Sequence, residues 1–261
     1  MAVTEAAPIL RRLSGKRGSS ERLVFVSGFH TSDYRDESLR GWVRAFRRAG
    51  WRGSVHWLWW DSFNSHRRFC RLWDALEWAG ANRKARRAGE LMPRVLRGVG
   101  GTGGLTLVGH SLGAKVIFEA LLALPEENDL PLKNVIFLAG AVHADRDDDW
   151  AAAARRISGA LCNVVNERDG VLGTRYFVGE LLRLSPGRAC GRIGAPSPDS
   201  SGSVINLDVT ELLDSDSHTS VYKDRLQDIL GWMWRSRRRL TWALAATAAA
   251  LAAAAALIIW V

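Results

Sequence analysis

Residues 105–124 read LTLVGHSLGAKVIFEALLAL, and this stretch decides the fold. An apolar run, Leu105–Val108, is followed by Gly109-His110-Ser111-Leu112-Gly113 and then by apolar residues at helical spacing. The pattern G-x-S-x-G between a strand and a helix is typical of a nucleophile elbow, which exposes a serine on a strained turn. Glycines are needed there because the neighbouring backbone leaves no room for β-carbons. The segment therefore predicts an elbow with Ser111 at its tip.

Short apolar runs alternate with helical patterns on both sides of this elbow. Such alternation predicts a mostly parallel sheet of about six strands with helices on both faces, which is an α/β fold. The runs are continuously apolar, as expected of strands covered on both faces. The predicted strands are Leu23–Ser27, Ser54–Trp59, Leu105–Val108, Asn134–Leu138, Leu161–Val165 and Val204–Leu207. We expect one such domain over residues 21–234.

The composition excludes several classes of protein. Of the 261 residues, 47% are hydrophobic and 24% are charged, which excludes a disordered chain. Three cysteines with no C-x-x-C pair fit neither a disulfide scaffold nor a zinc ribbon, and reduced thiols in a cytosolic setting are the simplest interpretation. We expect neither a metal nor an organic cofactor.

The two ends of the chain differ from its middle. Residues 1–20 are polar and basic, and we interpret them as a flexible arm. Residues 240–261, LTWALAATAAALAAAAALIIWV, carry no charge and as a helix would span roughly 33 Å, enough for a bilayer core. Arginines before the span place that side in the cytoplasm. Residues 235–261 are thus predicted to form a basic flank and a transmembrane tail anchor, with the N-terminal domain cytoplasmic; the alternative is an apolar helix packed inside the protein or an oligomer.

The net charge of +9 is concentrated outside residues 101–230. A basic chain can bind nucleic acid, but the sequence has no zinc-finger spacing, RNP-like aromatic stripe or basic zipper. A surface facing anionic lipid headgroups fits better beside a membrane segment. Genomic base composition is the alternative source of the arginine excess.

Several short motifs resemble the α/β-hydrolase superfamily over roughly residues 21–230. They are GHSLG at 109–113, VSGFH at 26–30, WWDS at 59–62 and SHTSVY at 217–222. More narrowly, the chain is similar to the branch that includes the transmembrane and coiled-coil domain type of hydrolases. The resemblance implies an α/β-hydrolase fold with catalytic residues in the chain order Ser, then Asp or Glu, then His.

A serine nucleophile needs a histidine base that is oriented by a carboxylate. His218 follows the last predicted strand, which is the expected place for the base. Asp169 follows the strand Leu161–Val165 at the sheet edge where α/β proteins bind ligands, and we predict it as the acid. Glu167 is the competing carboxylate. Asp145 and Asp147–Asp149 are more typical of a solvated helix start.

A tetrahedral intermediate needs two backbone N–H donors for its oxyanion. The residue after the nucleophile, Leu112, supplies one, and the resemblance implies Phe29 for the other. Gly28 allows close approach of that backbone. The expected pocket residues are Gly28, His30, His110 and His143.

The sequence thus predicts a membrane-anchored serine hydrolase with Ser111, His218 and Asp169 as its triad. Its expected partners are the bilayer, through residues 240–261, and an ester or acyl substrate, which the anchor and basic surface suggest is a lipid. Two alternatives stay open: a catalytically silent hydrolase-like membrane scaffold, and an acyltransferase using the same triad.

Overall fold

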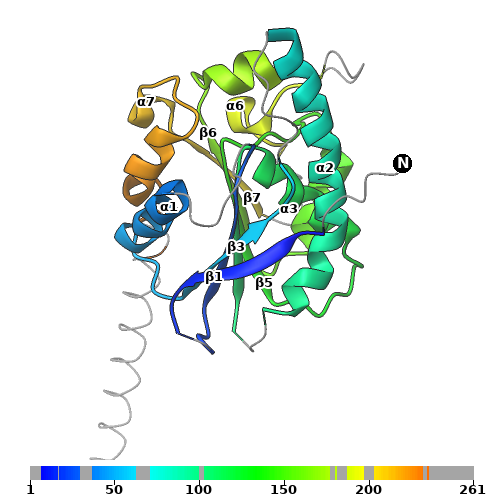
Figure 1. Cartoon of the computed structure of the whole chain (residues 1–261), viewed down its shortest axis with the longest axis vertical. Coiled ribbons are helices and arrows are strands. Elements are labelled where there is room, and N and C mark those ends of the chain that lie inside the picture. The colour runs from blue at the N-terminus through cyan, green and yellow to red at the C-terminus, as the bar shows by residue number, and fades with distance from the viewer. Residues whose placement is uncertain are drawn as a thin grey trace, which may run out of the picture.

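A mostly parallel β-sheet forms the centre of the protein in the computed structural model (Figure 1). The structure describes residues 7–16, 18–29, 37–62, 71–99, 103–176, 180, 187–196, 203–231 and 234. The strands are β1 (Ile9–Ser14), β2 (Arg22–Val26), β3 (Ser54–Trp59), β4 (Leu105–His110), β5 (Leu132–Leu138), β6 (Ala160–Val165) and β7 (Ser203–Asp208). The helices are α1 (Glu37–Arg48), α2 (Arg71–Arg97), α3 (Leu112–Ala123), α4 (Asp147–Arg155), α6 (Cys190–Ile193), α7 (Thr210–Leu213) and the π-helical turn η1 (Leu172–Tyr176). Residues 220–231 are also helical.

The seven described strands lie in the order β1-β3-β2-β4-β5-β6-β7. Strands β2 to β7 pair in parallel, which confirms the predicted mostly parallel sheet. All side chains of β2 and β4 are buried, because helices cover both faces of these central strands. The carboxyl ends of the parallel strands therefore lie along one edge of the sheet, the edge formed by strand ends, where the loops after β2, β4, β6 and β7 meet.

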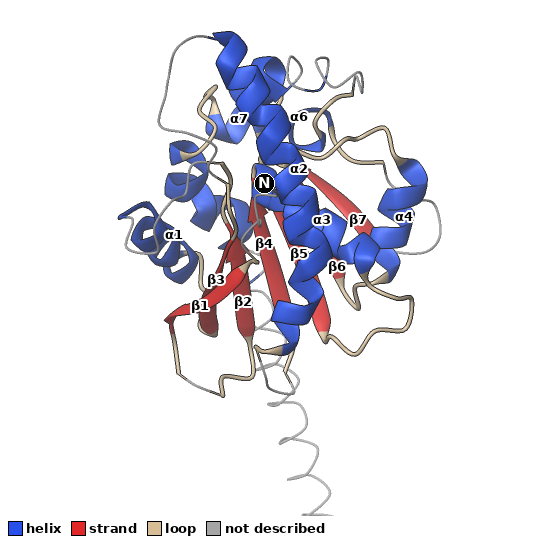
Figure 2. Cartoon of the chain, turned by 45° about the vertical axis from the view of Figure 1, so that its right-hand side comes forward, coloured by secondary structure: helices blue, strands red, loops and turns tan. Residues whose placement is uncertain are grey.

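Helices cover both faces of the sheet. Figure 2 shows α2 and α3 across one face, and α4 joins them there through Trp150, whose ring lies 4.7 Å from that of Phe118 on α3. Helix α1 covers the opposite face, with Trp42 4.8 Å from the Phe25 ring of β2. Helix α2 runs unbroken through Pro93, where the sequence favours a kink or a restart.

Strand β1 corrects the prediction for the N-terminal end. Residues 1–20 were expected to form a flexible arm, but Ile9–Ser14 pair antiparallel with β3 at the sheet edge. Leu10 and Leu13 pack against the core, and a register shift lies between Arg12 and Ser14. The flexible-arm interpretation is therefore wrong for this stretch. Two arginines and an irregular register interrupt the apolar pattern by which a half-buried edge strand is recognised in a sequence.

Three sequence predictions lie outside the described residues: the transmembrane anchor at 235–261, His30 and the thiol of Cys70. Within the part that the structure describes, no helix is both long and apolar enough to cross a membrane. Cys162 and Cys190 are free and buried, and burial raises the pKa of these thiols to about 11 and about 12.

Candidate active site

Ser111 occupies the sharp turn between β4 and α3. Its backbone has φ 55° and ψ −124°, a conformation that L-residues rarely adopt, and the residue is 3% exposed. A β-carbon on Gly113 would lie 2.0 Å from the carbonyl oxygen of Val26, and one on Gly109 would lie 2.5 Å from the Cα of Ala114. Both glycines are therefore required by the packing. The sheet and this elbow together confirm the α/β-hydrolase fold.

Backbone hydrogen bonds hold the strained turn in place. The N–H of Ser111 donates to the carbonyl of Leu138 over 3.0 Å. The Ser111 carbonyl accepts from the N–H groups of Ala114 and Ala141, over 3.0 and 3.2 Å. Strain of this kind persists only where the surroundings over-determine it, and here the end of β5 does so.

The structure brings Asp169 and His218 together. His218 Nδ1 lies 2.8 Å from Asp169 Oδ2, and the Asp169 side chain is fully buried. The second carboxylate oxygen, Oδ1, accepts hydrogen bonds from the N–H groups of Val171 and Leu172, each over 3.0 Å. Both carboxylate oxygens are thereby engaged: Oδ1 by the two backbone N–H groups and Oδ2 by the imidazole.

The loops that carry this pair are joined to each other. The Asn166 side-chain amide donates to the carbonyl of Ser215 over 3.0 Å, and the N–H of Gly170 donates to the carbonyl of Asp216 over 3.2 Å. Arg168 forms a salt bridge to Glu211 on α7 over 2.8 Å. The loop after β6 and the loop before helix 220–231 therefore form one unit.

His110 connects that unit to the elbow. Its Nε2 lies 2.8 Å from the carbonyl oxygen of His218, and the two imidazole rings are 5.1 Å apart. A carbonyl only accepts hydrogen bonds, so Nε2 must carry the proton. Burial, with the neighbouring His218 as a second cause, lowers the pKa of His110 to about 3, so the ring is neutral near pH 7. The Nε2 of His218 is itself buried and has no hydrogen-bond partner among the described residues.

The loop after β2 lies directly against the elbow. A β-carbon on Gly28 would lie 2.8 Å from the Cβ of Ser111. The indole N–H of Trp57 donates to Ser27 Oγ over 3.0 Å, and that of Trp60 donates to the Ser27 carbonyl over 2.9 Å. These tryptophans belong to the core, as their apolar run favours, but they also position the residue before Gly28. Sequence spacing gives no signal for that second role.

The other predicted site residues are distributed as follows. Leu112 opens α3, where the backbone N–H has no partner within the helix. Glu167, the competing acid, is exposed. His143 has partners other than Asp169 and His218: its Nε2 lies 2.8 Å from the buried Glu180, whose other oxygen accepts from Asn82 over 2.5 Å. The assignment of His110 and His143 to a substrate pocket stays a prediction.

A cavity of about 480 Å³ adjoins the carboxyl ends of β6 and β7. Its acidic lining residues are Asp145, Asp147, Glu167 and Asp208. Over the residues the structure describes, no three or more His, Cys, Asp or Glu side chains are grouped closely enough to hold a metal ion.

The amino-acid sequence of the chain is similar to parts of larger known proteins. A rice protein (Oryza sativa subsp. japonica) named "Transmembrane and coiled-coil domain-containing protein STS1" is 35% identical over 157 residues, which are 59% of this chain and 22% of that protein. "Probable lipase MIL1" of Saccharomyces cerevisiae is 27% identical over 110 residues, which are 42% of this chain and 10% of that protein. The chain thus spans less than a quarter of the length of either relative.

Solved structures with a related chain arrangement include a lipase-esterase related protein from Clostridium acetobutylicum. It is 12% identical, with a TM-score of 0.42, and the match covers 88% of this chain and 99% of that chain. A serine hydrolase without lid from Xanthomonas campestris is 16% identical with a TM-score of 0.41, over 89% of this chain and 88% of that chain.

A family model matches the part of the chain that carries the elbow, Asp169 and His218. The matched range is 73–233, which is more than half of the chain. The protein therefore belongs to the family described as "Protein of unknown function (DUF726)".

Proposed function

We propose that this protein is a membrane-anchored serine hydrolase that cleaves a carboxylic ester or acyl lipid through Ser111, His218 and Asp169. The observation that carries the proposal is the 2.8 Å contact between His218 and the buried Asp169, in a loop that His110 joins to the Ser111 elbow. A serine on a strained turn and an imidazole oriented by a carboxylate are the two parts that make an alcohol nucleophilic when they meet.

In this reaction, His218 Nε2 accepts the Ser111 hydroxyl proton while Oγ forms a bond to the acyl carbon. The unpartnered state of Nε2 among the described residues leaves that nitrogen available for the proton. The tetrahedral intermediate then loses the alcohol, which takes the proton from His218, and leaves an acyl-enzyme. Water, deprotonated by His218, cleaves the acyl-enzyme and restores the serine.

Asp169 orients the imidazole throughout. Its contact with Nδ1 makes Nδ1 the protonated nitrogen, so Nε2 keeps a lone pair that can accept the proton of the nucleophile. The exposed Glu167 is not in a position to do this. The carboxylate also stabilises the imidazolium that forms when the proton is transferred.

The oxyanion is assigned to the backbone N–H groups of Leu112 and Phe29. The Leu112 amide opens α3, where the helix dipole favours negative charge. The close approach of Gly28 to Ser111 brings the Phe29 segment alongside the same elbow. No metal or organic cofactor takes part in this scheme.

The membrane and lipid parts of the proposal come from the sequence and from relatives. Residues 240–261 are uncharged and long enough for a bilayer core. One relative is named a transmembrane protein, and another a probable lipase. A bilayer-anchored domain with the N-terminal part in the cytoplasm would meet acyl lipids as its nearest esters.

The test uses the full chain in non-ionic detergent. A fluorophosphonate probe should label the wild type, since Ser111 Oγ displaces fluoride from phosphorus, and p-nitrophenyl esters of short and long acyl chains should be hydrolysed. Ser111→Ala should lose both signals, whereas Ser62→Ala, a buried serine outside the proposed triad, should keep them. Equal labelling of wild type and Ser111→Ala would exclude the hydrolase and favour a silent scaffold.

Adding a primary alcohol separates hydrolysis from acyl transfer. A hydrolase releases mainly free acid, whereas a transferase forms the new ester as its main product. Predominant ester formation would replace hydrolysis by acyl transfer while keeping the same triad.

A further inference from the structure

A basic cavity of about 400 Å³ lies at the opposite edge of the sheet from Ser111. Arg22 begins β2 and Ser54 begins β3, and both line the cavity, whereas Ser111 follows the carboxyl end of β4. Parallel strands place these ends on opposite edges, so the cavity is separate from the candidate active site. Its other lining residues include Leu10, Arg12, His56 and Val99.

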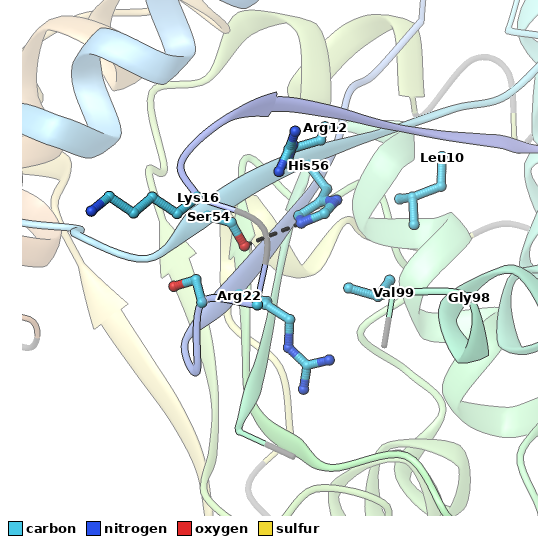
Figure 3. Close-up of a pocket in the computed structure, with 10 residues that line it drawn as sticks. Leu10, Arg12, Lys16, Arg22, Ser54, His56, Gly98 and Val99 are labelled. Carbon is cyan, nitrogen blue, oxygen red and sulfur yellow. Dashed lines mark hydrogen bonds between the residues drawn. The ribbon is translucent and has the colours of Figure 1, made fainter. Parts of the chain in front are cut away.

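Positive charge gathers around this cavity. In Figure 3, Arg12 and His56 lie on one side and the Arg22 guanidinium on another, while the Lys16 ammonium extends away from them. The described residues that line the cavity include no carboxylate. Among the described residues, neither Arg12 nor Arg22 forms a salt bridge.

Arg22 is the residue that most needs an anion. It is 5% exposed, and its Nη2 donates to the carbonyl of Gly103, but its Nε is buried without a partner among the described residues. A buried guanidinium is normally paired, because an uncompensated buried charge is strongly unfavourable. The Nε–H of Arg22, unpaired among the described residues, therefore indicates a site where an anionic ligand would supply the missing counter-charge.

His56 adds a neutral donor or acceptor beside the two guanidinium groups. Its Nε2 lies 3.1 Å from Ser54 Oγ. Burial first, and then the charges of Arg12 and Arg22, lower the pKa of His56. An anion between these groups would offset the repulsion.

We propose that this cavity binds the phosphate group of an organic phosphate, with Arg12 and Arg22 pairing its oxygens and His56 and Ser54 as hydrogen-bonding groups. Guanidinium forks match phosphate oxygens in geometry as well as in charge. Leu10 and Val99 form an apolar wall beside the charges, which suits the carbon part of the ligand.

The phosphate can belong to a soluble phosphomonoester or to a phospholipid headgroup. The last described residue, Trp234, lies 5.5 Å from the Trp51 ring, and Trp51 donates to the carbonyl of Ser54, which lines the cavity. Trp234, the last described residue before the predicted anchor, therefore lies toward the edge of the sheet where the cavity is. If the proposed anchoring is correct, a phospholipid headgroup would be within reach of the cavity. The headgroup as the source of the phosphate therefore rests on the proposed function.

The test titrates the full chain in non-ionic detergent by calorimetry. The soluble probe is glycerol 3-phosphate, and the lipid probes are micelles containing phosphatidic acid or phosphatidylcholine. Arg12→Gln changes an exposed lining residue and should weaken phosphate binding about tenfold. Arg83→Gln removes another exposed arginine, on α2, and should leave binding unchanged.

The outcomes separate the two sources. Saturable binding of glycerol 3-phosphate that Arg12→Gln weakens supports a soluble ligand, and the same behaviour for phosphatidic acid alone supports a headgroup. Absence of saturable binding to any probe, or equal weakening by Arg12→Gln and Arg83→Gln, overturns the proposal. Ser111→Ala should bind phosphate like the wild type, so failure of the hydrolase and failure of this site are distinguishable.

Discussion

The buried His110 imidazole makes the stability of the protein depend on pH. The ring is folded away from solvent, and burial lowers its pKa from 6.5 to about 3. Between these values the unfolded chain binds a proton that the folded chain excludes, so the contribution of His110 to stability is present above pH 6.5 and is lost as the pH falls toward 3. At pH 5 the unfolded state gains about 2 kcal/mol from this proton.

The perturbation that isolates this effect is His110→Gln. A glutamine amide can still donate to the His218 carbonyl but does not titrate. Urea unfolding of the full chain in non-ionic detergent at pH 7.5 and pH 5 should show that the wild type loses about 2 kcal/mol more than the variant. With a slope of about 3 kcal/mol/M, the wild-type midpoint should fall by about 0.7 M more. Comparing the two proteins removes every contribution that they share, and an equal loss in both would refute the buried neutral ring.

Three further changes test how the candidate site is positioned. Asp169→Asn should lower kcat in ester hydrolysis roughly ten-thousandfold with little change in KM, because the imidazole loses its preferred tautomer; unchanged kcat would remove Asp169 from the triad. Gly28→Ala should lower kcat about a hundredfold, because the new methyl group displaces the loop from Ser111, whereas Gly41→Ala, whose methyl group would meet only the Lys223 side chain at an ordinary 3.8 Å, should not; similar rates in both would contradict the assigned contact. Trp60→Phe should lower the unfolding free energy by about 2 kcal/mol, measured by urea unfolding, because the Ser27 carbonyl loses its buried donor; a stability equal to the wild type would show that this bond is dispensable.

Local patterns were sufficient to predict the central strands and the elbow. The runs that became β2, β3 and β6 are apolar over most of their length rather than alternating, and such runs have few alternatives to a covered strand. The elbow was predictable because the backbone excludes a β-carbon at Gly109 and Gly113, and this requirement appears in the sequence as glycines at fixed positions around Ser111. Strand β1 was not, because its position depends on pairing with β3, more than 40 residues along the chain.

The same distinction divides the candidate site. Chain order in a known type of fold was enough to select Asp169 and His218, and the structure brings these two together. The contacts that hold them were not predictable, since Asn166 meets Ser215 only after the loops following β6 and β7 converge. The hydrogen bond from the His110 ring to the His218 carbonyl was not predictable for the same reason, because it joins loops 108 residues apart in the chain.

The two proposed sites share a buried nitrogen without a partner among the described residues, His218 Nε2 at one edge of the sheet and Arg22 Nε at the other. That feature alone does not mark a site, because Trp78 Nε1 is equally buried and unpartnered. The surroundings make the difference. An indole N–H carries no charge and takes part in no proton transfer, whereas His218 is held by a carboxylate and Arg22 is a cation with no carboxylate among the described residues that line its cavity. Each nitrogen therefore needs a partner of its own kind. His218 Nε2 needs a proton donor, which the reacting serine supplies in the proposed reaction, and Arg22 needs an anion from outside the described chain segments.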